Sequence, residues 1–256
     1  MPADSTLEIV LVYPELLGTY GDRGNAVALA HRARGHGLDY RLTEVTATDP
    51  LPRSADIYLV GGGEDGAMLL AWDLLRSDGG LLQALEGGAV CFGVCAGFQL
   101  LSREFRGPDE AVHEGLGLLD VRCGRLRGRR AVGEVIAEPE PGGPVGFLTG
   151  FENHQGDAVL GPQARPLGRL VRGVGNGDGR TEGACQGQVV GTYLHGPALV
   201  RNDGLADHLL ERVAGALVPF DDELVRQLRQ ERRTAALSAR TSAWNRLKRR
   251  PGTSRP

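Results

Sequence analysis

The stretch AVCFGVCAGFQLLSREF, residues 89–105, decides the fold of this chain of 256 residues. Its apolar start, Ala89–Phe92, predicts a short buried strand, and Ala96–Phe105 has the pattern of a helix. Between them lies Gly93-Val94-Cys95-Ala96-Gly97, a G-x-nucleophile-x-G turn that carries cysteine. A sharp turn of this kind exposes its central side chain, and the amides that begin the helix are expected to lower the pKa of the Cys95 thiol. The alternative is a buried cysteine at a glycine-rich turn.

Strand and helix patterns alternate on both sides of this stretch. Continuous apolar runs predict strands buried on both faces at 7–13 and 56–60, and an alternating pattern predicts a strand at 40–45. Between and after these strands, helical spacing predicts helices at 22–35, 65–76 and 80–86. After Gly107 the pattern changes to strands between Gly/Pro turns, at 116–122, 131–138, 145–151, 167–174 and 188–194, before a helix at 203–217. The sequence therefore predicts an α/β fold. We expect a three-layer open sheet, mostly parallel with antiparallel additions, and helices on both faces.

Composition excludes several classes of protein. Hydrophobic residues make up 41% and charged residues 24%, as in ordinary globular domains. No run of about 18 apolar residues predicts a membrane span, and the N-terminus lacks the features of a signal peptide. The four cysteines form no CxxC pair, so we expect no metal site. Because a secretion signal is lacking, we expect reduced thiols and a cytoplasmic location. Nucleotide binding is disfavoured because no P-loop is present.

Charge divides the chain unevenly. Residues 226–256 hold ten Lys/Arg and one acid, which gives +9, so residues 1–225 carry −12. We predict a main domain over 1–217 and a basic helical tail over 218–256, with a disordered end. The tail could lie on the acidic body, dock a partner, or bind a membrane surface or nucleic acid. The acidic body counts against nucleic acid.

A cysteine nucleophile needs a base. His195 follows the apolar run Val189–Leu194, and α/β sheets place their sites at the carboxyl ends of such strands. Gly61-Gly62-Gly63 ends another predicted strand, and its amides could hold an oxyanion or form a flexible loop. We therefore expect Cys95, His195 and this loop to meet at one edge of the sheet.

Several motifs in a fixed order carry a family resemblance. They are GGGED (61–65), GVCAGFQLL (93–101), GFENHQG (150–156) and GTYLHGP (191–197), with YGDRGN (20–25) before them. Together they resemble the CobB/CobQ-like glutamine amidotransferases, and among these the GatD glutaminase subunits of lipid II isoglutaminyl synthases. The resemblance covers about residues 7–215 and implies the class I glutamine amidotransferase, flavodoxin-like fold.

The resemblance also implies roles for individual residues. Cys95 would attack the carboxamide of L-glutamine, and His195 would move the protons. The remaining substrate contacts would come from the oxyanion amides of Gly62, Gly63 and Ala96 and from Gln99, Asn153 and His154. Gln99 could instead be a surface residue, and His154 could cap a turn. Arg130, in the context R-x-x-G-E, would bind the α-carboxylate of glutamine, although the arginines over 125–129 leave this assignment open.

One feature departs from the common triad of this class, His-Pro-Glu, because His195 is followed by Gly196-Pro197. A carboxylate of this chain or of a partner would then orient the imidazole, and the resemblance implies a partner aspartate. It also implies a heterodimer with a MurT-like Mur ligase subunit, which would hold ATP and Mg²⁺ and amidate D-glutamate of lipid II at the inner membrane surface. No cofactor is expected in this chain, which alone would be a weak glutaminase. The alternatives are another acceptor such as a corrinoid acid, a stand-alone cysteine hydrolase, or a non-catalytic interaction subunit.

Overall fold

The structure, a computed structural model, describes residues 5–19, 21–140 and 146–248, with side-chain surroundings up to Ala235. Tyr20 therefore lies outside the described residues. The end of the tail, which we predicted to be disordered, also lies outside them. The chain divides into two compact units, residues 1–221 and residues 222–256. In its described part the second unit consists of one helix, α7 (Glu223–Lys248). None of the described helices has an apolar stretch long enough to cross a lipid bilayer.

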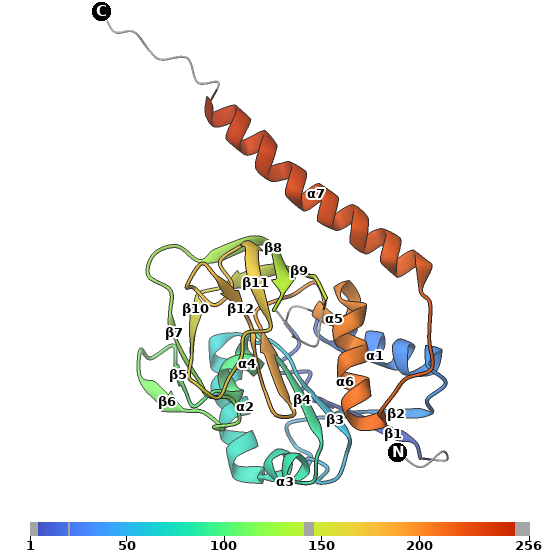
Figure 1. Cartoon of the computed structure of the whole chain (residues 1–256). Coiled ribbons are helices and arrows are strands. Elements are labelled where there is room, and N and C mark those ends of the chain that lie inside the picture. Colours follow the sequence, from blue (N-terminus) through green and yellow to red (C-terminus); the bar gives the residue numbers. More distant parts are fainter. Residues whose placement is uncertain (1–4, 20, 141–145, 249–256) are drawn as a thin grey trace, which may run out of the picture. The chain divides into compact units, whose positions relative to one another are not determined.

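A six-stranded sheet forms the centre of the first unit (Figure 1). Its order is β13-β14-β4-β3-β1-β2, and every neighbouring pair is parallel except β13 and β14. The strands are β1 (Leu7–Val12), β2 (Tyr40–Val45), β3 (Ile57–Val60), β4 (Val90–Val94), β13 (Ala184–Gln186) and β14 (Val189–Thr192). The four inner strands are almost entirely buried, as expected for apolar runs covered on both faces.

Helices cover both faces of this sheet (Figure 1). Helix α1 (Arg23–Gly35) packs with α6 (Asp203–Ala214) on one face, and α2 (Asp65–Asp78) packs with α4 (Ala96–Leu101) on the other. Two shorter helices complete the first unit, α3 (Gly80–Glu86) and α5 (Ala198–Arg201). The predicted three-layer α/β architecture is confirmed.

Two four-stranded sheets form the additions to this core, in the orders β10-β7-β5-β6 and β12-β11-β8-β9. They are antiparallel apart from the pair of β5 and β7. Their strands are β5 (Glu104–Arg106), β6 (Val112–Glu114), β7 (Val121–Arg125), β8 (Ala131–Pro139), β9 (Leu148–His154), β10 (Gly156–Leu160), β11 (Gly168–Arg172) and β12 (Thr181–Glu182). The motif GFENHQG thus lies on β9 and at the start of β10.

The predicted helix over 96–105 is too long. Helix α4 ends at Leu101, because the next residue is extended and the Ser102 hydroxyl lies within hydrogen-bond distance of the carbonyls of Gln99 and Glu104. The amides of Leu116 and Leu118 then bind the last carbonyls of the helix, so the strand predicted from 116 begins only at Val121. The chain leaves the helix early and enters β5.

Candidate active site

The candidate nucleophile, base and glycine loop follow the carboxyl ends of neighbouring parallel strands of the six-stranded sheet. Connections leave β1 toward β2 on one side and β3 toward β4 on the other, so the strand order reverses between β1 and β3. Open α/β sheets bind their ligands beside such a reversal. Asp22 lies in the connection after β1, Gly61–Gly63 follow β3, Cys95 follows β4, and His195 follows β14. The predicted meeting of these loops at one edge is therefore what the topology produces.

Cys95 occupies a strained turn between β4 and α4. Its φ is 54° and its ψ is −104°, a region that residues with a Cβ rarely adopt. The Cys95 amide donates to the Thr192 carbonyl on β14 at 2.8 Å, which fixes the turn to the strand that leads to His195. A Cβ on Gly97 would overlap the Val60 carbonyl oxygen, so glycine is needed where α4 crosses the end of β3.

The environment of the Cys95 thiol differs from the prediction. Burial, followed by the negative charge of Asp22, raises the pKa of this thiol to about 12. The Ala96 amide at the start of α4 and the charge of Arg130 act in the opposite direction but are outweighed. The expected lowering of the pKa is therefore wrong for the resting structure. Cys95 is a protonated thiol there, and its use as a nucleophile requires a base.

His195 is buried at the end of β14, with 3% of its surface exposed. Its backbone amide and carbonyl both pair with Phe151 on β9, at 2.8 and 3.0 Å. The imidazole turns Nδ1 toward Asp22, with 3.9 Å between Nδ1 and Oδ1. This places a base on the strand next to that of the nucleophile and a carboxylate behind the base.

Asp22 is a buried carboxylate near His195 that was not among the predicted site residues. It is 2% exposed, its Oδ2 accepts the Gly62 amide at 2.7 Å, and its Oδ1 lies 3.3 Å from the side-chain nitrogen of Asn25. The common triad carries its carboxylate two residues after the histidine, where this chain has Pro197. The sequence signal for Asp22 is the motif Gly21-Asp22-Arg23-Gly24-Asn25, which lies far from His195 along the chain.

The proposed oxyanion amides differ in their present partners. The Gly62 amide is engaged by Asp22, and the Gly61 carbonyl accepts the Gly97 amide at 3.0 Å. Gly63 lines the cavity beside Cys95, and the Ala96 amide acts directly on the thiol. The Ala96 amide is therefore already a donor at the thiol, whereas the Gly62 amide is held by Asp22.

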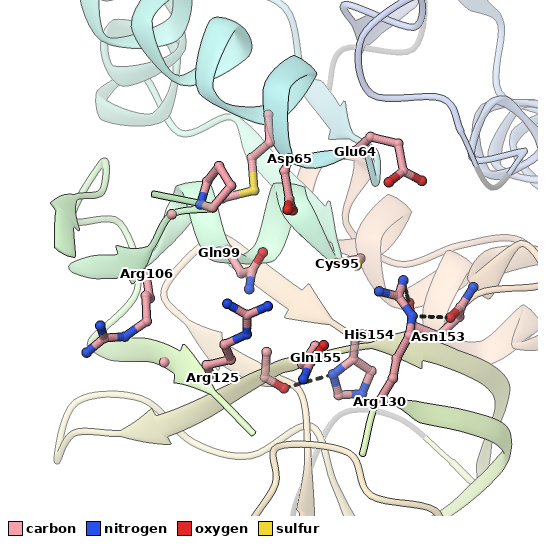
Figure 2. A pocket seen from close by; sticks show the side chains of 16 residues that line it. Glu64, Asp65, Cys95, Gln99, Arg106, Arg125, Arg130, Asn153, His154 and Gln155 are labelled. Carbon is pink, nitrogen blue, oxygen red and sulfur yellow. Dashed lines mark hydrogen bonds between the residues drawn. The ribbon is translucent and has the colours of Figure 1, made fainter. Parts of the chain in front are cut away.

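A cavity of about 120 Å³ opens beside Cys95 (Figure 2). Its walls contain six of the nine predicted site residues, namely Gly63, Cys95, Gln99, Arg130, Asn153 and His154. Gly62, Ala96 and His195 do not line it. Gln99 thus faces the cavity and is not a solvated helix residue, which answers one alternative.

Two of the four candidate arginines over 125–130 reach this cavity, Arg125 and Arg130 (Figure 2). Arg125 is paired with Glu110. Arg130 donates from Nε to the Asn153 side-chain oxygen at 2.6 Å and from its terminal nitrogen to the Asn153 carbonyl at 3.0 Å. Since Arg125 is paired with Glu110, Arg130 is the better placed of the two to bind a carboxylate in this cavity.

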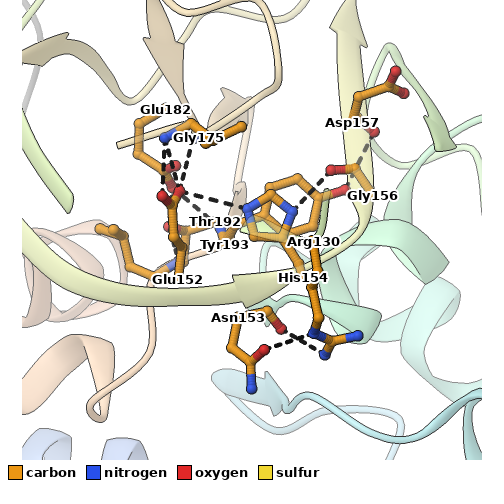
Figure 3. A network of polar contacts seen from close by, with 12 residues as sticks. Arg130, Glu152, Asn153, His154, Gly156, Asp157, Gly175, Glu182, Thr192 and Tyr193 are labelled. Carbon is orange, nitrogen blue, oxygen red and sulfur yellow. Dashed lines mark hydrogen bonds and ion pairs between the residues drawn. The ribbon is translucent and has the colours of Figure 1, made fainter. Parts of the chain in front are cut away.

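His154 connects the cavity to a buried polar network (Figure 3). Its Nδ1 lies 2.8 Å from the Gly156 carbonyl, and its ring stacks on Tyr193 with 4.0 Å between centroids. Nε2 lies 3.7 Å from Glu152, whose carboxylate accepts two backbone amides of the 174–175 turn. Burial opposes ionisation of Glu152, but His154 and these amides outweigh it and lower the pKa of the carboxyl. A fixed imidazole, and not only a turn cap, therefore faces the site.

Glu182 forms the far end of the same network and was also missed. It is fully buried and accepts hydrogen bonds from the Thr192 hydroxyl and the Tyr193 amide, just before His195. Burial, and to a lesser extent the charge of Glu152, raises the pKa of Glu182 to about 7, although those two hydrogen bonds oppose the rise. No sequence pattern marks this glutamate. Within the described residues, no three His, Cys, Asp or Glu side chains gather as a metal ion would require.

Comparison with known proteins places this chain in a family. Residues 8–203 match the model of the CobB/CobQ-like glutamine amidotransferase domain. Among solved structures, a glutamine amidotransferase superposes with a TM-score of 0.54 at 22% identity, over 80% of this chain and 98% of that one. The PurLQS structure from Thermotoga maritima gives 0.55 at 18% identity, over 82% and 98%. These two likenesses support the fold alone.

Curated relatives are more similar in sequence. The GatD subunit of lipid II isoglutaminyl synthase (glutamine-hydrolyzing) from Staphylococcus aureus (strain N315) is 33% identical, over 80% of this chain and 84% of its own length. The subunit of the same name from Streptococcus pneumoniae (strain ATCC BAA-255 / R6) is 32% identical, over 80% and 79%. A cobyric acid synthase from Pelotomaculum thermopropionicum is 32% identical over 81% of this chain but only 40% of its own length.

Proposed function

The chain belongs to the family of CobB/CobQ-like glutamine amidotransferases, and from this premise we propose that it is the glutaminase subunit of a lipid II isoglutaminyl synthase. Membership of the family makes it an amidotransferase enzyme subunit. The two GatD relatives align over 84% and 79% of their own length, and their names support the lipid II acceptor.

The chemistry that we propose begins with His195 taking the thiol proton of Cys95. Since Nδ1 faces Asp22, Nε2 is the ring nitrogen that would exchange this proton. The sulfur bonds to the carboxamide carbon of L-glutamine. The oxyanion of the tetrahedral intermediate then accepts hydrogen bonds from the backbone amides of Ala96 and Gly63. The C–N bond then breaks, His195 protonates the leaving nitrogen, and ammonia departs from a thioester. Water, deprotonated by the same imidazole, cleaves the C–S bond, and glutamate and the thiol are released.

The observation that carries this proposal is the cavity beside Cys95. The nucleophile lies at one wall, and Arg130, Gln99, Asn153 and His154 line the others. Arg130 offers a planar pair of donors to the α-carboxylate of glutamine, and its hydrogen bonds to Asn153 fix its direction. An amino acid held at its α-carboxylate by Arg130 would present its side-chain amide toward Cys95.

We further propose that the ammonia passes to a MurT-like Mur ligase subunit in a cytoplasmic heterodimer. That partner would hold ATP and Mg²⁺, activate the α-carboxylate of D-glutamate in lipid II, and form D-isoglutamine at the inner membrane surface. The names of the two GatD relatives support this assignment, because each is a subunit of such a synthase. The product would serve peptidoglycan biosynthesis.

Glutamate release by the full-length chain tests the hydrolytic half of the proposal. We expect Cys95→Ala to abolish it and Cys185→Ala, at a cysteine outside the cavity, to leave it unchanged. A glutamine-analogue electrophile should label Cys95 in the wild-type chain. Unchanged hydrolysis in Cys95→Ala would refute the mechanism.

Mass spectrometry of lipid II tests the acceptor. A strain that carries Cys95→Ala should contain unamidated D-glutamate in lipid II, whereas a strain with Cys185→Ala should not. Normal amidation together with a loss of amidated corrinoids would favour the alternative acceptor.

A further inference from the structure

We propose that Glu64 binds the α-ammonium group of the substrate, opposite Arg130, so that the site selects amides that carry both charges of an α-amino acid. The inference rests on the proposed glutaminase function and deepens it. It names the class of substrate that the cavity beside Cys95 accepts, an amide with a carboxylate and an ammonium group on one carbon. Glu64 was not among the predicted site residues.

The walls of this cavity carry charges of both signs. They contain three arginines and two carboxylates, namely Arg106, Arg125, Arg130, Glu64 and Asp65. Glu110, which does not line the cavity, pairs with both Arg106 and Arg125. Within the described residues, neither Glu64 nor Asp65 forms an ion pair. The cavity therefore keeps an anionic wall that no cation of the described chain neutralises.

Glu64 and Arg130 lie on opposite sides of the nucleophile. In Figure 2, the side chain of Glu64 lies above Cys95 and that of Arg130 lies below it. Glu64 is the N-cap residue of α2, but its side chain makes no cap bond to the first turn of that helix. Its carboxylate therefore remains available to a ligand in the cavity.

Both side chains also act on the Cys95 thiol. Burial is the largest cause of the raised pKa of this thiol, and among the charged residues of the cavity Arg130 lowers the pKa while Glu64 raises it. A carboxylate that bound no cation here would only weaken the nucleophile. An ammonium group at Glu64 would offset its charge, so the arrival of the substrate would itself favour ionisation of Cys95.

The charges of L-glutamine match this arrangement. Its α-carboxylate and α-ammonium groups share one carbon, so a carboxylate bound to Arg130 brings the ammonium group to the space between the two walls. Asp65 lines the same cavity, but its side chain lies on the side of Gln99 in Figure 2. It is also not among the charges that act on Cys95. Glu64 is therefore the carboxylate that faces both Arg130 and the nucleophile.

The test compares L-glutamine with glutaramate, which is glutamine without its α-amino group, as substrates of the full-length chain. The wild type should prefer L-glutamine in kcat/KM. In Glu64→Gln the ratio of the two kcat/KM values should fall about tenfold, because the neutral amide no longer pairs with the ammonium group. Arg130→Ala should lower kcat/KM for both compounds, because both carry the carboxylate. Glu86→Gln, at an exposed glutamate at the end of α3, should keep the wild-type ratio.

Alkylation of Cys95 by iodoacetamide, a neutral reagent, gives a second readout. Without glutamine, Glu64→Gln should react faster than the wild type at the same pH, because a charge that disfavours the thiolate is gone. A merely structural role of Glu64 would not produce this change, and alkylation no faster than in the wild type would overturn the proposed effect of the substrate charge on the thiol.

The ratio decides the assignment of the ammonium group. A ratio in Glu64→Gln within about threefold of the wild type would overturn it, and so would a loss of the ratio in Asp65→Asn alone. Each of these results leaves the Cys95→Ala test intact, whereas an active Cys95→Ala variant would refute the glutaminase function itself.

Discussion

Replacing Glu182 by glutamine should make the stability of the protein less dependent on pH. Glu182 is fully buried, and its Thr192 and Tyr193 partners both donate to one oxygen, which the amide oxygen of glutamine can replace. The substitution removes a titratable group and retains those two hydrogen bonds. The backbone before His195 should therefore stay in place.

The magnitude follows from the pKa of the buried carboxyl. Burial raises the pKa from an ordinary 4.5 to about 7, so the folded state binds the proton more tightly than the unfolded state does. Both states are protonated below pH 4.5. Between pH 4.5 and 7 the unfolded state has released the proton and the folded state has not, so stability falls as pH rises. At 1.36 kcal/mol per pKa unit, the wild type should lose about 3 kcal/mol over this window through Glu182.

Urea denaturation at pH 5 and pH 8 measures this effect. Relative to wild type, Glu182→Gln should gain about 2–3 kcal/mol in free energy of unfolding on going from pH 5 to pH 8. Glu138→Gln, at an exposed carboxylate of β8, serves as the matched control and should show no such gain. An equal change in stability at both pH values for Glu182→Gln would refute the reasoning.

Three further outcomes are expected. Arg130→Ala should raise KM for glutamine about 10- to 100-fold, whereas Arg129→Ala, outside the cavity, should not, and equal effects of the two would reject Arg130 as the carboxylate-binding residue. Gly97→Ala should prevent stable folding, because the added Cβ overlaps the Val60 carbonyl, and a wild-type melting temperature would contradict this. Removing residues 222–256 should leave the first unit folded, with a melting temperature within a few degrees of wild type. Unchanged co-purification of that shortened chain with the ligase-like subunit would reject a docking role for the tail.

The elbow could be predicted from the sequence because all its determinants are local. The strand before Cys95, the glycines around it and the start of α4 occupy a few consecutive residues. The parallel sheet followed from the apolar runs for the same reason. The end of α4 was missed because it depends on the backbone amides of Leu116 and Leu118, which no helical pattern records.

Asp22 and Glu182 could not be identified because their partners are distant in sequence. Asp22 meets Gly62 and His195 only when β1, β3, β4 and β14 lie side by side. The residue two positions after His195 is Pro197, so the local sequence marks no carboxylate near the imidazole. The lowered thiol pKa was also expected from a local argument, the helix start, while burial within the folded unit decides it.

The backbone of Cys95 has a consequence for the history of this fold. A residue with a Cβ at φ 54° and ψ −104° costs about 1–3 kcal/mol, a noticeable part of the 5–15 kcal/mol that keeps a domain folded. Glycine would relieve that strain, although its greater freedom in the unfolded chain returns up to about 1 kcal/mol. A non-catalytic relative would gain nothing from the cysteine side chain at this position, so its replacement by glycine would not be selected against. At position 95 we therefore expect cysteine in catalytically active relatives and glycine in relatives that have lost the activity.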